Sequence, residues 1–307
     1  LNTGRYTSAG AGTQTAGLAF GGGPGTIAST EEYNGSGWSN GGNLNTGRTR
    51  LEGAGTQTAG LAFGGQAPSV TGATEEYNGS AWTTNPGSLN TARYYLSGCG
   101  TQTAALGFAG ATSPPEPSNL SNSTEEYNGS AWTAGGNLGT ARYSLAGAGT
   151  QTAGLAFAGQ TSTVRTAATE EYNGTAWTGG GSLASAKRQL AGAGLQTAGL
   201  AFGGETSAIE DSATTEKYDG TSWSDGENMA TARRVLSGFG TQSAGLAFGG
   251  LPPGVTTATE EYNSNINAFT PAVWSLGGAL VSLRKGTNKG GAGTKNAALL
   301  FGGRPNP

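Results

Sequence analysis

Bulky and small residues alternate along a short segment that returns throughout the chain. In one copy, Leu61 and Phe63 alternate with Gly60, Ala62 and Gly64. Successive side chains of a β-strand point to opposite faces, so this pattern predicts a strand with one bulky face and one nearly flat face. Such asymmetry favours sheets that stack with the bulky face of one against the flat face of the next.

The alternating segment belongs to a longer repeat. Gly-Thr-Gln-Thr-Ala-Gly-Leu-Ala-Phe-Gly-Gly begins at Gly12 and returns, with substitutions, at intervals of 43 to 53 residues. The later copies begin at Gly55, Gly100, Gly149, Gly194, Gly240 and Gly293. A second segment, Thr-Glu-Glu-Tyr-Asn-Gly-Ser-Ala-Trp in its commonest form, occurs six times between these copies. A fixed period of this length is typical of repeat architectures.

Each unit predicts four short strands, which we call a, b, c and d. Representative copies are residues 96–100 for strand a, 59–64 for b, 73–77 for c and 81–83 for d. Asn78-Gly79 lies between strands c and d, and this dipeptide is a strong signal for a tight hairpin in which both residues adopt positive φ. Helical periodicity is absent, so the sequence predicts an all-β fold.

The composition of strand a predicts how the units are arranged. This strand is almost entirely Ala and Gly, which suits strands that crowd around a common axis, as in a β-propeller of four-stranded blades. Seven a–b hairpins and six c–d hairpins predict seven blades, the seventh incomplete, with six blades as the alternative. We expect one domain over residues 1–307, as a segment of a longer polypeptide that completes the seventh blade. Otherwise the strand ending at 301–303 has an open edge that another segment or chain must cover.

The overall composition excludes several classes of function. The chain contains 58 Gly and 11 Pro, and 16 Lys and Arg stand against 19 Asp and Glu. This balance lacks the basic excess that nucleic-acid binding requires. No segment has the roughly 18 apolar residues typical of a membrane span. His is absent and Cys99 is the single cysteine, so we expect no metal, no cofactor and no internal disulfide.

Paired carboxylates recur in strand c, as at Glu125-Glu126. Neighbouring residues of a strand point to opposite faces, so such a pair does not form one glycosidase-type site. A basic residue occupies a fixed position before strand a of each unit, and we expect it to pair with a glutamate in every blade. These basic residues are Arg5, Arg48, Arg93, Arg142, Lys187 and Arg233. The sequence therefore favours a structural role for the pairs and predicts a protein that is not an enzyme.

The residue after each repeated basic residue is the first candidate for ligand binding. It is Tyr6, Tyr94 or Tyr143 in three units, and Arg188 or Arg234 in two others. This position begins the innermost strand, so we expect it to surround one mouth of the central channel. Tyrosine and arginine around a depression suit a sugar or an acidic group. The alternative is that they are solvated rim residues.

The loops between strands b and c are the second candidate. They contain 7 to 13 residues and share little sequence, whereas the a–b and c–d turns hardly vary. Function concentrates on variable loops held by a rigid scaffold. The longest loop, residues 111–123, contains Pro114, Glu116 and Asn119, which we take as candidates for a partner contact; the alternative is a tolerated insertion.

Two resemblances follow from these motifs. A Gly-Gly doublet after strand b, then Tyr, then Trp, resembles the kelch repeat, although the Tyr-to-Trp spacing is shorter here. Tandem GTQTAGLAFGG and TEEYNGSAW units resemble repeats in virion structural proteins of marine bacteriophages, including those of cyanobacteria. The copper chemistry found on some kelch-type propellers needs His ligands that this chain lacks.

The phage resemblance implies a structural or binding module without catalytic activity, in a tail fibre or appendage of the virion. Its expected partners are other virion proteins, a host surface glycan or protein, or a second copy of the chain. The alternative is a secreted or cell-surface bacterial adhesin, or a glycan-binding propeller, with the same fold.

Overall fold

The computed structural model describes residues 1–116, 118–207, 210–251 and 254–264, together with four short strands between residues 284 and 305. Contacts divide the chain into two compact units, Leu1–Ser264 and Asn265–Pro307, and each is described by itself. The expectation of one domain over residues 1–307 therefore stays a prediction. Among the described residues, no helix has the length and apolar character needed to cross a membrane.

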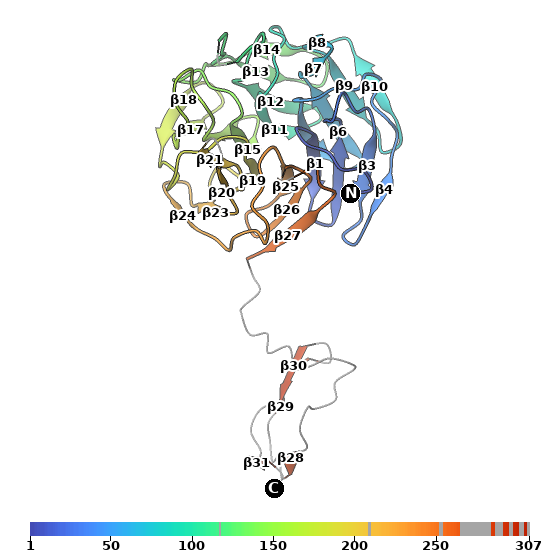
Figure 1. Cartoon of the computed structure of the whole chain (residues 1–307), viewed down its shortest axis with the longest axis vertical. Coiled ribbons are helices and arrows are strands. Elements are labelled where there is room, and N and C mark those ends of the chain that lie inside the picture. Colours follow the sequence, from blue (N-terminus) through green and yellow to red (C-terminus); the bar gives the residue numbers. More distant parts are fainter. Residues whose placement is uncertain are drawn as a thin grey trace. The chain divides into compact units, whose positions relative to one another are not determined.

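The first unit is a β-propeller (Figure 1). Its sheets are antiparallel throughout and are arranged around a central axis, and the described residues form no helix. Five blades have four strands and the sixth has three described strands. The predicted all-β propeller is confirmed.

Each blade runs outward from the axis in the order predicted from the sequence. The innermost strands are β1 (Ala9–Thr13), β5 (Glu52–Thr56), β11 (Ser97–Thr101), β15 (Ala146–Thr150), β19 (Ala191–Leu195) and β25 (Ser237–Gly240). The second strands are β2 (Ala16–Phe20), β6 (Ala59–Phe63), β12 (Ala104–Phe108), β16 (Ala153–Phe157), β20 (Ala198–Phe202) and β26 (Ala244–Phe248). The third strands are β3 (Thr30–Tyr33), β9 (Thr74–Tyr77), β13 (Thr124–Tyr127), β17 (Thr169–Tyr172), β23 (Thr215–Tyr218) and β27 (Thr259–Asn263). The outer strands are β4 (Trp38–Asn40), β10 (Trp82–Asn85), β14 (Trp132–Ala134), β18 (Trp177–Gly180) and β24 (Trp223–Asp225).

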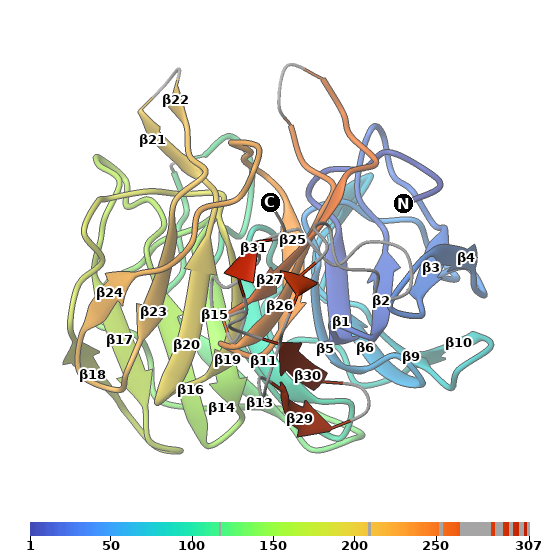
Figure 2. The same cartoon turned by 90° about the horizontal axis from the view of Figure 1, so that it is seen from below.

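Two small hairpins rise from the b–c loops. One pairs β7 (Gln66–Ala67) with β8 (Ser69–Val70), and the other pairs β21 (Glu205–Ser207) with β22 (Glu210–Asp211). Figure 2 shows the β21–β22 hairpin at the end of the propeller where these loops gather. In the second unit, β28 (Arg284–Lys285) pairs with β31 (Arg304–Pro305), and β29 (Gly291–Thr294) pairs with β30 (Ala297–Leu300).

The described ring closes with six blades. β25 of the sixth blade packs against both β19 of the fifth blade and β1 of the first. Six is the count that the sequence left as the alternative. The preferred count of seven came from the number of a–b hairpins, and the seventh hairpin, β29–β30, forms as expected but belongs to the second unit. Strand d of the sixth c–d hairpin that the sequence predicts, with its tryptophan at Trp274, and the edge at residues 301–303 lie outside the described residues.

Neighbouring blades stack bulky face against flat face, as the alternation predicted. A Cβ atom built on Gly60 lies 2.7 Å from Cδ2 of Leu18 in the preceding blade. Gly154 and Leu106 show the same spacing two interfaces further on, between the third and fourth blades. This position is glycine in five blades and alanine, Ala105, in the third, so the flat face accepts at most a methyl group beside the bulky side chain of the preceding blade.

Farther from the axis, a Trp–Phe pair lies at five of the interfaces between the described blades. The Trp82 ring centroid lies 4.7 Å from that of Phe20 in the preceding blade, and its Nε1–H donates to Thr30 Oγ1 at 2.9 Å. The same bond to a strand-c threonine is made by Trp38, Trp132, Trp177 and Trp223. The repeated tryptophans therefore join consecutive blades through both packing and a directed hydrogen bond.

The predicted pairing of basic residues with strand-c glutamates is confirmed in all six blades. Arg93 Nη2 lies 2.9 Å from Glu125 Oε1 of the same blade, and its Nη1 donates to the carbonyl oxygens of Ala109 and Ser123. Lys187 replaces the arginine in the fifth blade and reaches Glu216 at 2.9 Å. The other pairs are Arg5–Glu31, Arg48–Glu75, Arg142–Glu170 and Arg233–Glu260.

The second glutamate of each pair accepts a hydrogen bond from the strand-c tyrosine of the next blade. Tyr127 donates its hydroxyl hydrogen to Glu76 Oε1 at 2.6 Å. Equivalent bonds run from Tyr33 to Glu261, Tyr77 to Glu32, Tyr172 to Glu126 and Tyr218 to Glu171. In the fifth blade Lys217 occupies this glutamate position, so the bond is not repeated with Tyr262. Each carboxylate pair is thus divided between an internal ion pair and an interface hydrogen bond.

A glutamine in every a–b turn adds a further link between blades, which the sequence reading missed. Gln102 Nε2 donates to the carbonyl oxygens of Gly60 and Tyr77 in the preceding blade, at 3.0 and 2.7 Å. Gln14, Gln57, Gln151, Gln196 and Gln242 make the same two bonds. The presence of Gln in all six of these turns was the available signal.

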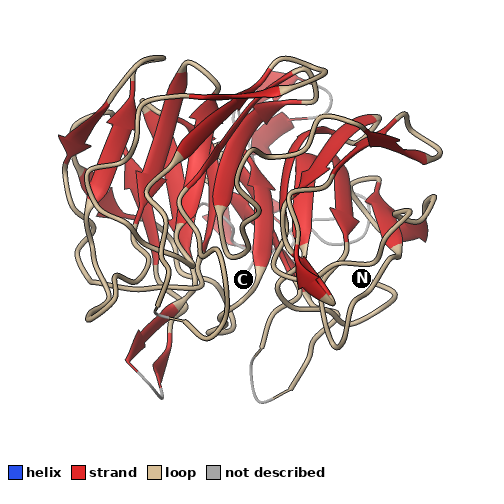
Figure 3. Cartoon of the chain, turned by 90° about the horizontal axis from the view of Figure 1, so that it is seen from above, coloured by secondary structure: helices blue, strands red, loops and turns tan. Residues whose placement is uncertain are grey.

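The Asn-Gly hairpins form, but with a different turn from the one predicted. Gly79 has φ of +91°, whereas Asn78 is absent from the residues with positive φ. The Asn78 side-chain oxygen instead accepts hydrogen bonds from the N–H groups of Ser80 and Ala81. The tight loop is therefore Gly79-Ser80, with glycine at the first loop position, and Asn78 stabilises it from the strand end. Figure 3 shows these short turns at the end opposite the longer loops.

Candidate functional site

A closed ring of backbone hydrogen bonds surrounds the axis at the loop-bearing end. In each blade, the residue two positions after the repeated basic residue donates its N–H to the equivalent carbonyl of the preceding blade, at 2.8–3.0 Å. The six residues are Thr7, Arg50, Tyr95, Ser144, Gln189 and Val235, which we call the mouth ring. All have φ between 48° and 59°. This conformation costs non-glycine residues about 1 kcal/mol or more each, and the ring bonds offset that cost.

The mouth ring lies one residue beyond the position predicted from the sequence. Tyr94 is fully buried and Tyr143 is 6% exposed, whereas Tyr6, Arg188 and Arg234 are partly exposed. Each of these five residues forms a β-bridge with the b–c loop of its own blade. The backbone turns inward only after this bridge, so the following residue reaches the axis. Whether Tyr6, Tyr94, Tyr143, Arg188 and Arg234 bind a ligand stays a prediction.

Side chains at the mouth ring differ in every blade, whereas the layers around them repeat. Directly below the ring lie Ser8 and five leucines, and a cavity of about 90 Å³ opens among these residues. The leucines are Leu51, Leu96, Leu145, Leu190 and Leu236. A near-identical scaffold therefore places one threonine, arginine, tyrosine, serine, glutamine and valine around a single opening. The arrangement can present distinct chemistry toward each side of a bound group.

Aromatic and cationic groups gather on one side of this opening. The Arg50 guanidinium carbon lies 4.7 Å from the Tyr95 ring centroid, and the Tyr95 and Tyr143 centroids are 6.0 Å apart. Arg50 Nη1 also donates to the Gln66 side-chain oxygen at 2.9 Å. A guanidinium beside an aromatic face is an arrangement found in ligand-binding surfaces.

The long third b–c loop approaches the same side. Glu116 lies 3.8 Å from Arg50 of the neighbouring blade, and burial together with the Glu116 carboxylate raises the pKa of Tyr94. Pro114 and Asn119 are exposed, and the Asn119 carbonyl accepts a hydrogen bond from Thr112 N–H at 3.0 Å. Of the three loop candidates, only Glu116 is thus brought to the mouth ring. A partner contact through Pro114 and Asn119 stays a prediction.

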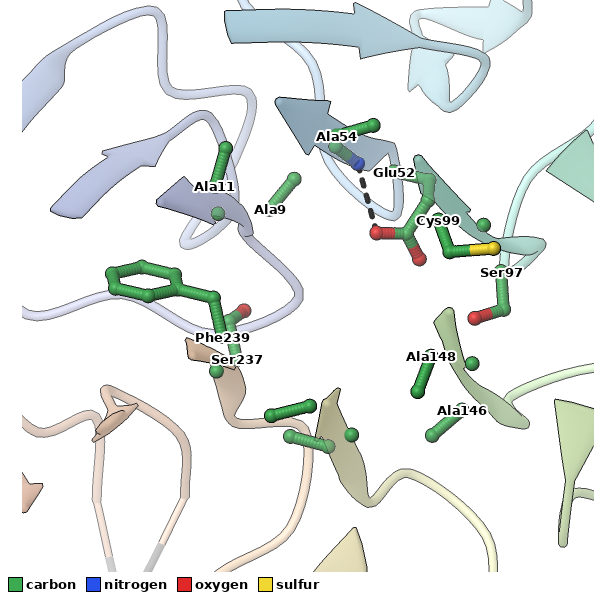
Figure 4. Close-up of a pocket in the computed structure, with 18 of the residues that line it drawn as sticks. Ala9, Ala11, Glu52, Ala54, Ser97, Cys99, Ala146, Ala148, Ser237 and Phe239 are labelled. Atoms are coloured by element: carbon green, nitrogen blue, oxygen red, sulfur yellow. Dashed lines mark hydrogen bonds between the residues drawn. The ribbon is translucent and has the colours of Figure 1, made fainter. Parts of the chain in front are cut away.

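A cavity of about 190 Å³ runs along the innermost strands below the mouth (Figure 4). Ala and Gly line most of it, as strand a predicted. Glu52 points into this channel, near Ser97 and Cys99, and its carboxylate accepts a hydrogen bond from Gly53 N–H at 2.8 Å. Withdrawal of the carboxyl group from bulk water raises the pKa of Glu52 to about 8.

Replacing Glu52 with glutamine is expected to stabilise the protein at alkaline pH. The folded-state pKa exceeds the ordinary value of 4.5, so wild-type stability falls as pH rises from about 4.5 to about 8 and then levels off. We expect the Gln variant to be more stable by roughly 3–5 kcal/mol at pH 9, and to differ little at pH 5. Urea unfolding at both pH values measures this; a difference that does not grow with pH contradicts it.

Charged residues from three blades meet at another part of the loop face. Arg188 Nη2 lies 3.2 Å from Glu205 Oε1, and Arg165 contacts the same oxygen. Arg234 Nε lies 4.0 Å from Glu205 Oε2, and its Nη1 reaches Asp211 Oδ1 at 2.6 Å. The sequence took Arg188 and Arg234 as binding candidates but did not bring them together with Arg165, Glu205 and Asp211, because unlike loop sequences do not reveal which residues meet in space.

Comparison with known proteins supports the fold alone. No protein-family model matches the chain, and no curated protein does. The chain is similar to a solved structure titled "Structure of YjhT", with a TM-score of 0.71 and 12% sequence identity, over 86% of this chain and 96% of that one. YjhT is also a propeller. Fold and comparison together define the class as a β-propeller built from tandem blades.

Proposed function

We propose that this chain is a non-enzymatic binding module of a phage virion, in a tail fibre or appendage, which attaches through its loop-bearing face. The observation that carries the proposal is the contrast between the two ends of the ring. At the end of the ring that carries the a–b and c–d turns, the same glutamine hydrogen bonds and the same glycine-containing turns recur from blade to blade. At the loop-bearing end, every mouth-ring residue differs. Variation confined to one end of a repeated scaffold is typical of a recognition surface.

The absence of catalytic activity is part of the same proposal. The repeated carboxylates, which are the most numerous candidate acids and bases, are held in ion pairs and interface hydrogen bonds, as at Glu125 and Glu76. Groups engaged in this way hold the blades together. The likeness of the repeats to those of marine phage virion proteins supports the assignment to a virion.

A secreted or cell-surface bacterial adhesin is the second candidate. The same loop face supports it, since recognition of a glycan or protein requires the same variable surface. The two candidates differ in where the chain is found, on a virion or at a bacterial surface.

Two experiments test the proposal. Mass spectrometry of purified particles is expected to detect the chain, and its detection on bacterial surfaces alone would favour the adhesin. Purified protein is expected to inhibit adsorption of the phage to host cells. A double variant, Arg50→Ala with Tyr95→Ala, should lose this inhibition, whereas Thr58→Ala in an exposed hairpin turn should retain it. Equal inhibition by both variants contradicts attachment through the mouth ring.

A further inference from the structure

Three arginines surround one buried carboxylate on the loop face. Glu205 is 3% exposed, whereas the Arg165, Arg188 and Arg234 side chains are 21%, 23% and 36% exposed. The carboxylate therefore lies beneath the guanidinium groups, which reach solvent. We call Arg165, Arg188 and Arg234 with Glu205 and Asp211 the arginine cluster.

Backbone pairing fixes the positions of this cluster. Arg188 forms a β-bridge with Glu205 of the fifth blade. Arg165 forms one with Gln160 within the b–c loop of the fourth blade. Gln160 in turn accepts a hydrogen bond from Arg188 Nη1 at 2.6 Å. The guanidinium groups are thus held in place before any ligand arrives, which lowers the entropic cost of binding.

The cluster carries more positive charge than its own acids neutralise. Three arginines face two carboxylates, Glu205 and Asp211, so one positive charge remains. A guanidinium has five N–H donors, and among the described residues Arg165 donates through Nη2 to Glu205 and Arg234 donates through Nη1 to Asp211. The cluster therefore retains both charge and donors for an additional acceptor.

Aromatic groups border the cluster on the side of the mouth ring. Arg188 Nη1 donates to the Tyr143 hydroxyl at 3.2 Å, and the Tyr143 ring lies beside Tyr95. Tyr143 is buried, so the partly exposed Tyr95 ring beside it offers the apolar face for a sugar, next to the charged arginine donors for a substituent. An oxyanion carried by a sugar matches both features.

We propose that the arginine cluster binds the oxyanion group of an acidic glycan, either a uronic acid carboxylate or a sulfate ester. This inference rests on the proposed function and specifies its ligand class. Arg165, Arg188 and Arg234 donate to the oxyanion, while Glu205 is a positioning residue that holds the guanidinium groups from below.

Isothermal titration with three oligosaccharides tests the proposal: one ending in glucuronate, one bearing a galactose sulfate, and a neutral one of the same length. Binding of either acidic sugar, but not of the neutral one, is expected. Arg234→Gln, at the most exposed arginine, should weaken binding at least about tenfold, because a charge-assisted hydrogen bond is lost. The control Lys217→Gln removes a positive charge from strand β23, outside the cluster, and should change affinity less than twofold.

Glu205→Gln distinguishes a binding site from a purely structural ion-pair cluster. Removing the buried countercharge leaves the guanidinium groups more positive, so affinity for the acidic sugar should rise, and its dependence on salt should steepen. If neither acidic sugar binds, or if Arg234→Gln and Lys217→Gln behave alike, the ligand assignment is wrong. Inhibition of phage adsorption that persists in that case would leave the proposed function intact.

Discussion

Replacing Arg93 with alanine is expected to lower the free energy of unfolding by about 3–5 kcal/mol, because a buried ion pair loses one partner. Glu125 is only 3% exposed and would be left buried without its cationic partner. The carbonyl oxygens of Ala109 and Ser123 would lose a donor at the same time. Urea unfolding followed by circular dichroism measures the loss.

The chain itself supplies the matched control for this variant. Lys187 occupies the same position in the fifth blade and bonds to Glu216 and to the Thr214 hydroxyl. Arg93→Lys should therefore retain most of the stability that Arg93→Ala loses. An alanine variant within about 0.5 kcal/mol of the wild type, the usual range for unconstrained surface positions, would show that the pair contributes nothing.

Trp132→Ala is expected to have a comparable effect, also about 3–5 kcal/mol, through loss of packing at an interface between blades. The Trp132 ring is 4% exposed, lies 4.9 Å from Phe63 of the preceding blade and 5.0 Å from Tyr127 of its own. Its Nε1–H donates to Thr74 Oγ1 at 2.9 Å. Alanine would remove both the aromatic contact and this bond.

Trp132→Phe separates the two contributions in the same unfolding experiment. Phenylalanine retains an aromatic ring but lacks the donor, so it should cost less than alanine, with roughly 1 kcal/mol of its effect due to the missing bond to Thr74. Equal destabilisation by both variants would assign the whole effect to the hydrogen bond, and contradict packing as the main contribution.

Much of the scaffold could be predicted because its determinants are local and repeated. Alternation in strand b set which residues face the neighbouring blade, and the structure places Leu18 against Gly60 as that pattern requires. The Arg93–Glu125 pair was also predictable, since both positions recur in every unit.

The candidate site was predictable only in part, because it depends on where the backbone turns. The sequence reading placed Tyr94 at the channel mouth, but the bridge between Tyr94 and Ala111 buries its ring, and Tyr95 follows with positive φ. Sequence patterning does not distinguish a position before such a turn from the position after it. Glu52 escaped notice for a related reason, since only the closed ring makes its side chain an isolated carboxyl group in a channel.

The amino-acid sequence by itself determined the strands, their order within a blade and the bulky-on-flat contact between blades, because each follows from side chains a few residues apart repeated along the chain. Only the tertiary structure decided the number of blades in the described ring, the six residues at its mouth and the meeting of Arg165, Arg188 and Arg234 around Glu205. Those features depend on the angle between successive sheets and on loops from different blades, which no local pattern encodes.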